Sequence, residues 1–126
     1  MSIHVVASAA APAAIGPYSP ATRVSDLVFV SGQLGIDPTS GELEPGVRAQ
    51  AVRAIDNLKA LLAAAGLGLE SVAKTTIFLT NMADFAVVNE VYAAAFKPPF
   101  PARSTIQVAA LPKGGLVEIE AIASRV

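Results

Sequence analysis

Arg103 is the residue of this sequence best suited to binding a small anion. It follows a proline-rich stretch, residues 98–101, and begins a segment with strand-like alternation. A guanidinium group matches a carboxylate through two parallel, charge-assisted hydrogen bonds. Two interpretations of Arg103 therefore stand side by side: a site for a carboxylate ligand, and a structural salt bridge on the surface of a sheet.

Glu118 is the acidic residue that could complement Arg103. A carboxylate in a cleft can accept or donate a proton, whereas the simpler interpretation is that Glu118 only pairs with Arg103. If the last two strands form a hairpin folded near Pro112, Gln107 lies opposite about residue 118 and Arg103 opposite about residue 122. This register disfavours a direct pair within one chain. The two side chains would then meet across a subunit boundary or approach one ligand from different sides.

Other kinds of site find little support. The single His, His4, lies near the start of the chain, so a Ser–His nucleophilic mechanism is not expected. Gly114 and Gly115 lie between two expected strands with no helix after them, which indicates a turn and not a phosphate-binding loop. Residues 37–44 are acidic, but their Asp, Pro, Ser and Gly content is typical of a turn. No metal and no cofactor is expected.

Composition narrows the class of protein. The chain has 126 residues, of which 53% are hydrophobic and 15% charged, and it contains no Cys. This size suits a single domain over residues 1–126, and the low charge leaves apolar surface to face another subunit. The net charge of −1 is unlike that of a nucleic-acid-binding protein. Disulfides are excluded, and no apolar run reaches the roughly 20 residues of a membrane span. We expect a cytoplasmic protein that binds neither nucleic acid nor membrane.

The hydrophobic pattern predicts an alternation of strands and helices. Strands are expected at residues 3–7, 27–34, 71–80, 102–109 and 116–123, and helices at 47–65 and from a cap at Asn81 or Asp84 to about Phe96. The segment 11–20 is a loop. Each helix has one apolar stripe to bury, so this order favours an α/β sandwich of one mixed sheet with both helices on one face.

Alternation also predicts which strand residues face the helices. The side chains expected to point away from them are Arg103, Thr105, Gln107, Glu118 and Glu120, and those expected beneath them are Ser104, Ile106, Val108, Val117, Ile119 and Ala121. Gly32 indicates a close approach of another backbone segment or a bulge. The uncovered polar face is either solvated or an interface. A cleft at a symmetric interface would account for such a face on an apolar chain.

Four segments of the chain together resemble one known family. They read AIGPYSPA (14–21), LVFVSGQLGIDPTSGEL (27–43), KTTIFLTNMADFAVVNEVY (74–92) and PARSTIQVAALPKGGLVEIEAIA (101–123). On these motifs the chain resembles the RidA/YjgF family of reactive intermediate imine deaminases. The resemblance implies a chorismate-mutase-like fold in a homotrimer with ligand clefts between subunits. It also implies cofactor-independent hydrolysis of 2-imino or 2-enamino acids, such as 2-aminoacrylate and 2-iminobutyrate, to 2-keto acids and ammonia.

The resemblance also implies roles for individual residues. Arg103 would bind the substrate carboxylate, and Glu118 would orient or deprotonate the attacking water. The residues implied to line the cleft are Tyr18, Ser31, Gly32, Asn89 and Thr105, the last at a position where the family often has Cys. By residue type alone, Tyr18 is equally a loop anchor, Ser31 a polar residue at a strand end and Asn89 a backbone cap.

Two other functions remain open at this stage. One is a binding module of the same fold that uses Arg103 to sense keto acids without turnover. The other is RNA cleavage or translation inhibition, which is ascribed to some relatives of the family. The balanced charge and the 6% aromatic content disfavour a nucleic-acid groove.

Overall fold

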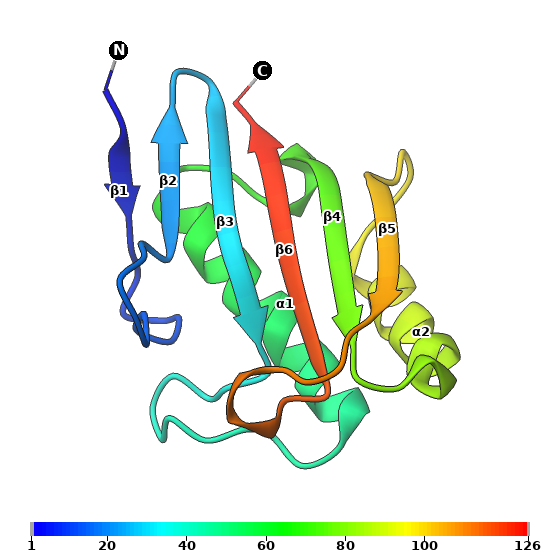
Figure 1. The fold of residues 1–126 in the computed structure, drawn as a ribbon. Coiled ribbons are helices and arrows are strands. Elements are labelled where there is room, and N and C mark those ends of the chain that lie inside the picture. Colours follow the sequence, from blue (N-terminus) through cyan, green and yellow to red (C-terminus); the bar gives the residue numbers. More distant parts are fainter. Residues whose placement is uncertain (1, 126) are drawn as a thin grey trace.

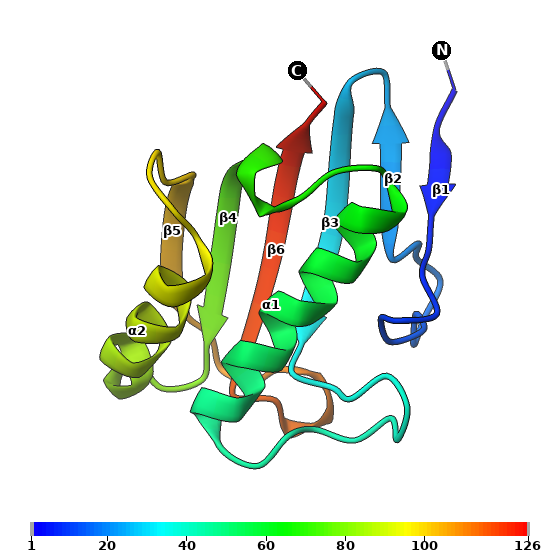
Figure 2. The same ribbon diagram turned by 180° about the vertical axis from the view of Figure 1, so that it is seen from behind.

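A six-stranded mixed sheet carries both long helices on one of its faces (Figures 1 and 2). The structure is a computed structural model, and it describes residues 2–125. The strands are β1 (His4–Val6), β2 (Ala21–Val24), β3 (Leu27–Leu34), β4 (Val72–Leu79), β5 (Ala102–Gln107) and β6 (Val117–Ser124). The helices are α1 (Val47–Ala64) and α2 (Phe85–Ala95), with short 3₁₀ turns at Leu69–Ser71, Met82–Asp84 and Pro112–Gly114. The predicted two-layer α/β class is confirmed.

Helix α1 lies along the middle of the sheet because its apolar residues recur at three- and four-residue spacing. Ala51, Ile55, Leu58 and Leu62 are all buried against the strands. The helix starts after Gly46, whose φ of 85° few other residues adopt, and its end is followed by Gly66 with φ 78°. The helix predicted over residues 47–65 is thereby confirmed to within one residue.

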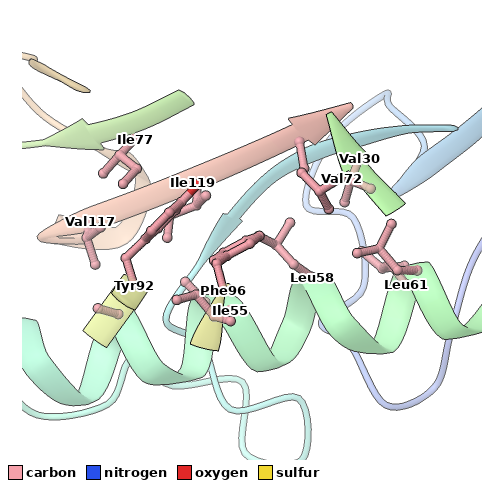
Figure 3. Close-up of a cluster of buried hydrophobic side chains, with 14 of the residues drawn as sticks. Val30, Ile55, Leu58, Leu61, Val72, Ile77, Tyr92, Phe96, Val117 and Ile119 are labelled. Atoms are coloured by element: carbon pink, nitrogen blue, oxygen red, sulfur yellow. The ribbon is translucent and has the colours of Figure 1, made fainter. Parts of the chain in front are cut away.

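Helix α2 covers the margin of the sheet beside β4 and β5 (Figure 2). Its N-terminal 3₁₀ turn is capped by Asn81, whose side chain accepts a hydrogen bond from the Ala83 N–H at 2.9 Å. Tyr92 and Phe96 stack at 4.2 Å between ring centroids and complete the core with residues of α1 and the sheet (Figure 3). The helix ends before Pro98 and Pro99, which cannot continue it.

The order of the strands, β1-β2-β3-β6-β4-β5, corrects the expected hairpin of residues 102–109 and 116–123. Strand β4 lies between the two, parallel to β5 and antiparallel to β6. The connection from β5 to β6 is long enough to cross the end of β4, unlike the short turns that join directly paired strands. The sequence prediction also missed β2, a strand of only four residues that follows Pro20.

The two faces of β5 are the reverse of the prediction. Arg103 and Thr105 pair with Thr75 and Ile77 of β4, both fully buried on the helix side, whereas Ile106 is 45% exposed on the open face. In β6 the predicted faces are confirmed, because Val117, Ile119 and Ala121 are buried and Glu118 and Glu120 point away from the helices. The polar set Arg103, Thr105 and Gln107 lies on the helix side because β5 is the edge strand of the sheet, so the rule that apolar residues face the helices failed there.

The open face of the sheet is more apolar than predicted. Phe29 of β3 is 39% exposed and pairs with Ile122 of β6, which is also exposed, as are Leu27 and Ile106. Glu118 and Glu120 therefore lie among large apolar side chains. Exposed apolar groups of this kind mark an interaction surface. No helix within residues 2–125 has the length and apolarity that crossing a membrane requires.

Candidate active site

A β-bulge at Ser31 and Gly32 shapes the surface beside Glu118. Val30 pairs with Ala121 but Gln33 pairs with Ile119, so β3 contains one more residue than β6 over this interval. A Cβ added to Gly32 would lie 2.7 Å from Cδ of Glu118. Of the two alternatives predicted at Gly32, the bulge is confirmed, and the group that approaches is a side chain, that of Glu118, instead of backbone. This contact explains why a residue without a side chain occupies the position.

Two hydrogen bonds from Ser31 hold the loop of residues 11–20 against the sheet. Its hydroxyl donates to the Ser19 carbonyl at 2.7 Å, and its N–H donates to the Pro20 carbonyl at 3.0 Å. The carbonyl of Ser31 accepts a hydrogen bond from the Gln33 side chain at 3.0 Å. These contacts give Ser31 a clear structural role, in which it fixes the loop that carries Tyr18.

Tyr18 lies at the edge of a small hollow that also contains Glu118. The Ile15 N–H donates to the Tyr18 hydroxyl at 3.2 Å, yet the Tyr18 residue is 47% exposed. The hollow has a volume of about 50 Å³ and is lined by Gly32, Pro112 and residues of the N-terminal loop as well as by Tyr18 and Glu118. This volume holds only a few water molecules. The hollow of one chain is therefore too small to enclose an organic acid.

Glu118 is partly buried, and within residues 2–125 it forms no ion pair. Burial raises the pKa of its carboxyl group above the usual value, and repulsion from Glu120 raises it further. A carboxyl group whose pKa is shifted toward neutrality both accepts and donates a proton readily near neutral pH. The environment of Glu118 is thus suited to acid–base chemistry.

The raised pKa of Glu118 predicts a pH-dependent stability. The folded chain binds this proton more tightly than the unfolded chain, so the associated stabilisation is complete below the unfolded pKa of about 4.3 and is lost as pH rises through the folded pKa. Glu118→Gln removes this titration. We expect urea unfolding to show a gain in stability for the variant over the wild type at pH 7.5, and a smaller gain at pH 4. An equal difference at both pH values would contradict the prediction.

Arg103 is held by aromatic rings. Its Cζ lies 4.9 Å from the ring centroid of Tyr92 and 5.7 Å from that of Phe85, both within the range of cation–π contacts. In the described part of the chain, no carboxylate pairs with Arg103. The alternative of a structural salt bridge within one chain is therefore wrong for those residues. The positive charge remains available to an anion.

Two further predicted site residues lie on the same side of the sheet as Arg103. Thr105 is two residues along β5, and its Oγ1 is buried without a hydrogen-bond partner within residues 2–125. Asn89 follows Phe85 by four residues and precedes Tyr92 by three, so it shares the helix face that contacts Arg103. The structure thus groups Arg103, Thr105 and Asn89 at the β5 edge.

The predicted site residues accordingly fall into two separate groups. Tyr18, Ser31, Gly32 and Glu118 lie around the bulge and the N-terminal loop, whereas Arg103, Thr105 and Asn89 lie at the edge formed by β5 and α2. Strand β4 separates Arg103 from Glu118, and the two side chains point to opposite faces of the sheet. A single chain does not bring these groups to one ligand.

The described residues give no indication of a metal centre. Among residues 2–125, no three His, Asp or Glu side chains are grouped in a way that could hold a metal ion. The acidic turn contains Asp37, which accepts hydrogen bonds from the Thr39 and Ser40 N–H groups at 2.7 and 3.4 Å. These bonds and the nearby Arg53 hold the pKa of the Asp37 carboxyl below its usual value. Asp37 therefore stabilises its own turn, as predicted.

Comparison with known proteins places the chain in a family. A family model described as Endoribonuclease L-PSP matches residues 8–125. The 2-iminobutanoate/2-iminopropanoate deaminase of Bos taurus is 52% identical over 120 residues, which cover 94% of this chain and 88% of the bovine protein. The enzyme of the same name from Homo sapiens is 50% identical, with 95% and 88% covered. The crystal structure of RidA from the Antarctic bacterium Psychrobacter sp. PAMC 21119 superposes with a TM-score of 0.95 at 50% identity, covering 96% of this chain and 98% of that one. The chain belongs to the RidA/YjgF family.

Proposed function

We propose that this protein hydrolyses small 2-imino acids, or their 2-enamine tautomers, to 2-keto acids and ammonia without a cofactor. The observation that carries the proposal is the guanidinium of Arg103, which forms no ion pair among residues 2–125 and is held at the sheet edge by aromatic rings. Sequence identity of about half to the bovine and human 2-iminobutanoate/2-iminopropanoate deaminases supports this substrate class. A cytoplasmic location belongs to the same proposal, because 2-imino acids arise where pyridoxal-phosphate dehydratases release them.

The reaction needs one anchor and one acid–base group. Arg103 binds the substrate carboxylate and so removes the freedom of a small, short-lived molecule. Water adds to the imine carbon while Glu118 accepts a proton from it. Glu118 returns this proton to nitrogen, which gives a carbinolamine. Glu118 then carries the hydroxyl proton of the carbinolamine to nitrogen as the C–N bond breaks, and the 2-keto acid and ammonia are released. Tyr18, Ser31, Gly32, Asn89 and Thr105 line the cleft in this proposal.

The active assembly in this proposal is a homotrimer with a cleft between neighbouring subunits. Its support is the separation of the two groups of site residues by β4, together with the apolar side chains on the open face of the sheet. The β5 edge of one subunit would face the bulge of the next. We expect sedimentation equilibrium to give three chains per particle. A monomer at assay concentration would contradict the shared cleft.

Gly32→Ala tests the contact between the bulge and Glu118. The new methyl group would lie 2.7 Å from Cδ of Glu118 and so must displace the carboxylate. We expect kcat for imine hydrolysis to fall by roughly 10- to 100-fold, since small misplacements of a reacting group have effects of this size. Gly16→Ala is the matched control, because its methyl group would meet only the Tyr18 ring at 3.6 Å. Equal activity of the two variants would show that the position of the Glu118 carboxylate is unimportant.

The proposed activity is tested by generating 2-aminoacrylate and 2-iminobutyrate in the cuvette with a dehydratase. The release of keto acid is then followed with and without this protein. Acceleration supports the deaminase, whereas saturable binding of 2-oxobutanoate without acceleration would favour a carboxylate-binding module.

RNA cleavage is a second candidate because the matching family model is described as Endoribonuclease L-PSP. Single-stranded RNA incubated with wild type and with Arg103→Ala separates this candidate from contamination. Equal cleavage by both preparations would indicate a contaminating nuclease.

A further inference from the structure

Tyr92 is a core residue that also contacts the proposed substrate anchor. Its ring centroid lies 4.9 Å from Cζ of Arg103, closer than the ring of Phe85 at 5.7 Å. The two rings differ in their surroundings, because Tyr92 is only 5% exposed whereas Phe85 is 38% exposed. Tyr92 therefore offers Arg103 the better-fixed surface.

Two neighbours immobilise the Tyr92 ring. The ring stacks on Phe96 with an interplanar angle of 20°, and the core residues around both are visible in Figure 3. Its hydroxyl forms a hydrogen bond of 2.7 Å with Thr75 Oγ1, and Thr75 is fully buried. Burial also raises the pKa of the Tyr92 hydroxyl above its usual value, so it remains a neutral hydrogen-bonding group. Thr75 pairs with Arg103 across β4 and β5, which ties the ring to the strand that carries the guanidinium.

Contact with an aromatic ring orders the Arg103 side chain without occupying its charge, whereas an ion pair would occupy it. A long Arg side chain loses conformational entropy when it is ordered, so an anchor that is ordered beforehand binds its ligand more tightly. A carboxylate from the protein would order Arg103 but would compete with the carboxylate of the substrate. An aromatic face orders the guanidinium and leaves its charge and its in-plane N–H donors unused.

We propose that Tyr92 is a positioning residue for Arg103, whose ring fixes the guanidinium plane so that its N–H edge receives the substrate carboxylate. This inference deepens the proposed function and rests on it. Tyr92 does not touch the reacting atoms. Its contribution is to affinity for the carboxylate, so its loss raises KM and leaves kcat almost unchanged.

Tyr92→Leu and Tyr92→Phe separate the ring from the hydroxyl. Leu keeps an apolar side chain in the core but removes the aromatic face, whereas Phe keeps the face and loses only the hydrogen bond to Thr75. For Tyr92→Leu we expect about a tenfold rise in KM and in the Kd for 2-oxobutanoate, within the range of a desolvated cation–π contact. For Tyr92→Phe we expect both constants to stay within about threefold of the wild type.

Two controls test whether the expected rise in KM and Kd of Tyr92→Leu comes from the lost contact with Arg103. Val91→Ala also removes buried volume from α2, but Val91 faces α1, where it lines a hollow with Ile55 and Ala95, so this variant should lower stability without changing KM. In the Arg103→Ala background, Tyr92→Leu should not weaken 2-oxobutanoate binding further, because the two residues act as one unit.

The outcomes distinguish this inference from the proposed function. Arg103-dependent binding of 2-oxobutanoate that Tyr92→Leu leaves unchanged would overturn the positioning role and leave the proposed function intact. Equal weakening by Val91→Ala would also overturn it, since the effect would then be structural. Binding by the wild type that Arg103→Ala leaves unchanged would overturn both proposals.

Discussion

Replacing Arg103 by Ala is expected to lower kcat/KM for imine hydrolysis by at least about 100-fold, the equivalent of losing a charge-assisted, bidentate interaction. The melting temperature should stay near that of the wild type. The reason is that Arg103 has no ion pair in residues 2–125, so its removal leaves no carboxylate of the described chain unpaired. The dehydratase-coupled assay and a thermal melt measure the two quantities.

Two further variants test whether the loss of activity is specific to the guanidinium group of Arg103. Arg103→Lys keeps the positive charge but loses the planar fork, so an intermediate activity is expected. Arg48→Ala removes an exposed Arg of α1 whose ion pair with Glu90 lies on the outer surface, and it should leave the rate unchanged. Full activity of the Arg103→Ala variant would contradict the proposal that Arg103 binds the substrate carboxylate.

Glu118→Gln is expected to lower kcat by roughly 100-fold or more, the usual contribution of a positioned acid–base group. Affinity for 2-oxobutanoate should change little, because Gln has nearly the shape of Glu beside Gly32. The wild-type rate should fall as the pH drops through the raised pKa of Glu118, and this acid limb should be missing in the variant. Steady-state rates between pH 5 and 8, with binding measured by calorimetry, test both statements.

Glu120→Gln is the matched control for this second prediction. Glu120 is an exposed residue on the same face, and its charge contributes to the raised pKa of Glu118. Its replacement should preserve the maximal rate and move the acid limb to lower pH. If Glu118→Gln instead weakened binding and left kcat at the wild-type value, Glu118 would be a binding group and not the proton carrier.

The sequence predicted the helices well because their signals are local. The apolar spacing of α1 and the glycines at its ends are all contained within about 20 residues of sequence. The order of the strands depends on contacts between distant segments, and the expected hairpin was wrong for that reason. No sequence pattern within residues 108–116 indicates that this connection crosses the end of β4.

The same distinction applies to the candidate site. Gly32 was predicted to allow a close approach, and its neighbour proved to be the carboxylate of Glu118, from the other end of the chain. Tyr92 has the spacing of an apolar helix stripe, and core packing and support of a guanidinium give the same spacing. The position of Arg103 on the helix side of β5 would have been the signal, but the predicted face of that strand was reversed.

The central claim is that imine hydrolysis takes place where Arg103 of one subunit meets Glu118 of another, and mixing the two inactive variants tests it most directly. Arg103→Ala and Glu118→Gln chains are refolded together in equal amounts, and keto-acid release from 2-iminobutyrate is compared with that of each variant alone and of the wild type. Random assembly gives a complete pair of residues in about a quarter of the shared clefts, so about a quarter of the wild-type rate should return. A mixture as inactive as its parents, or a wild type that does not accelerate keto-acid release, would contradict the account.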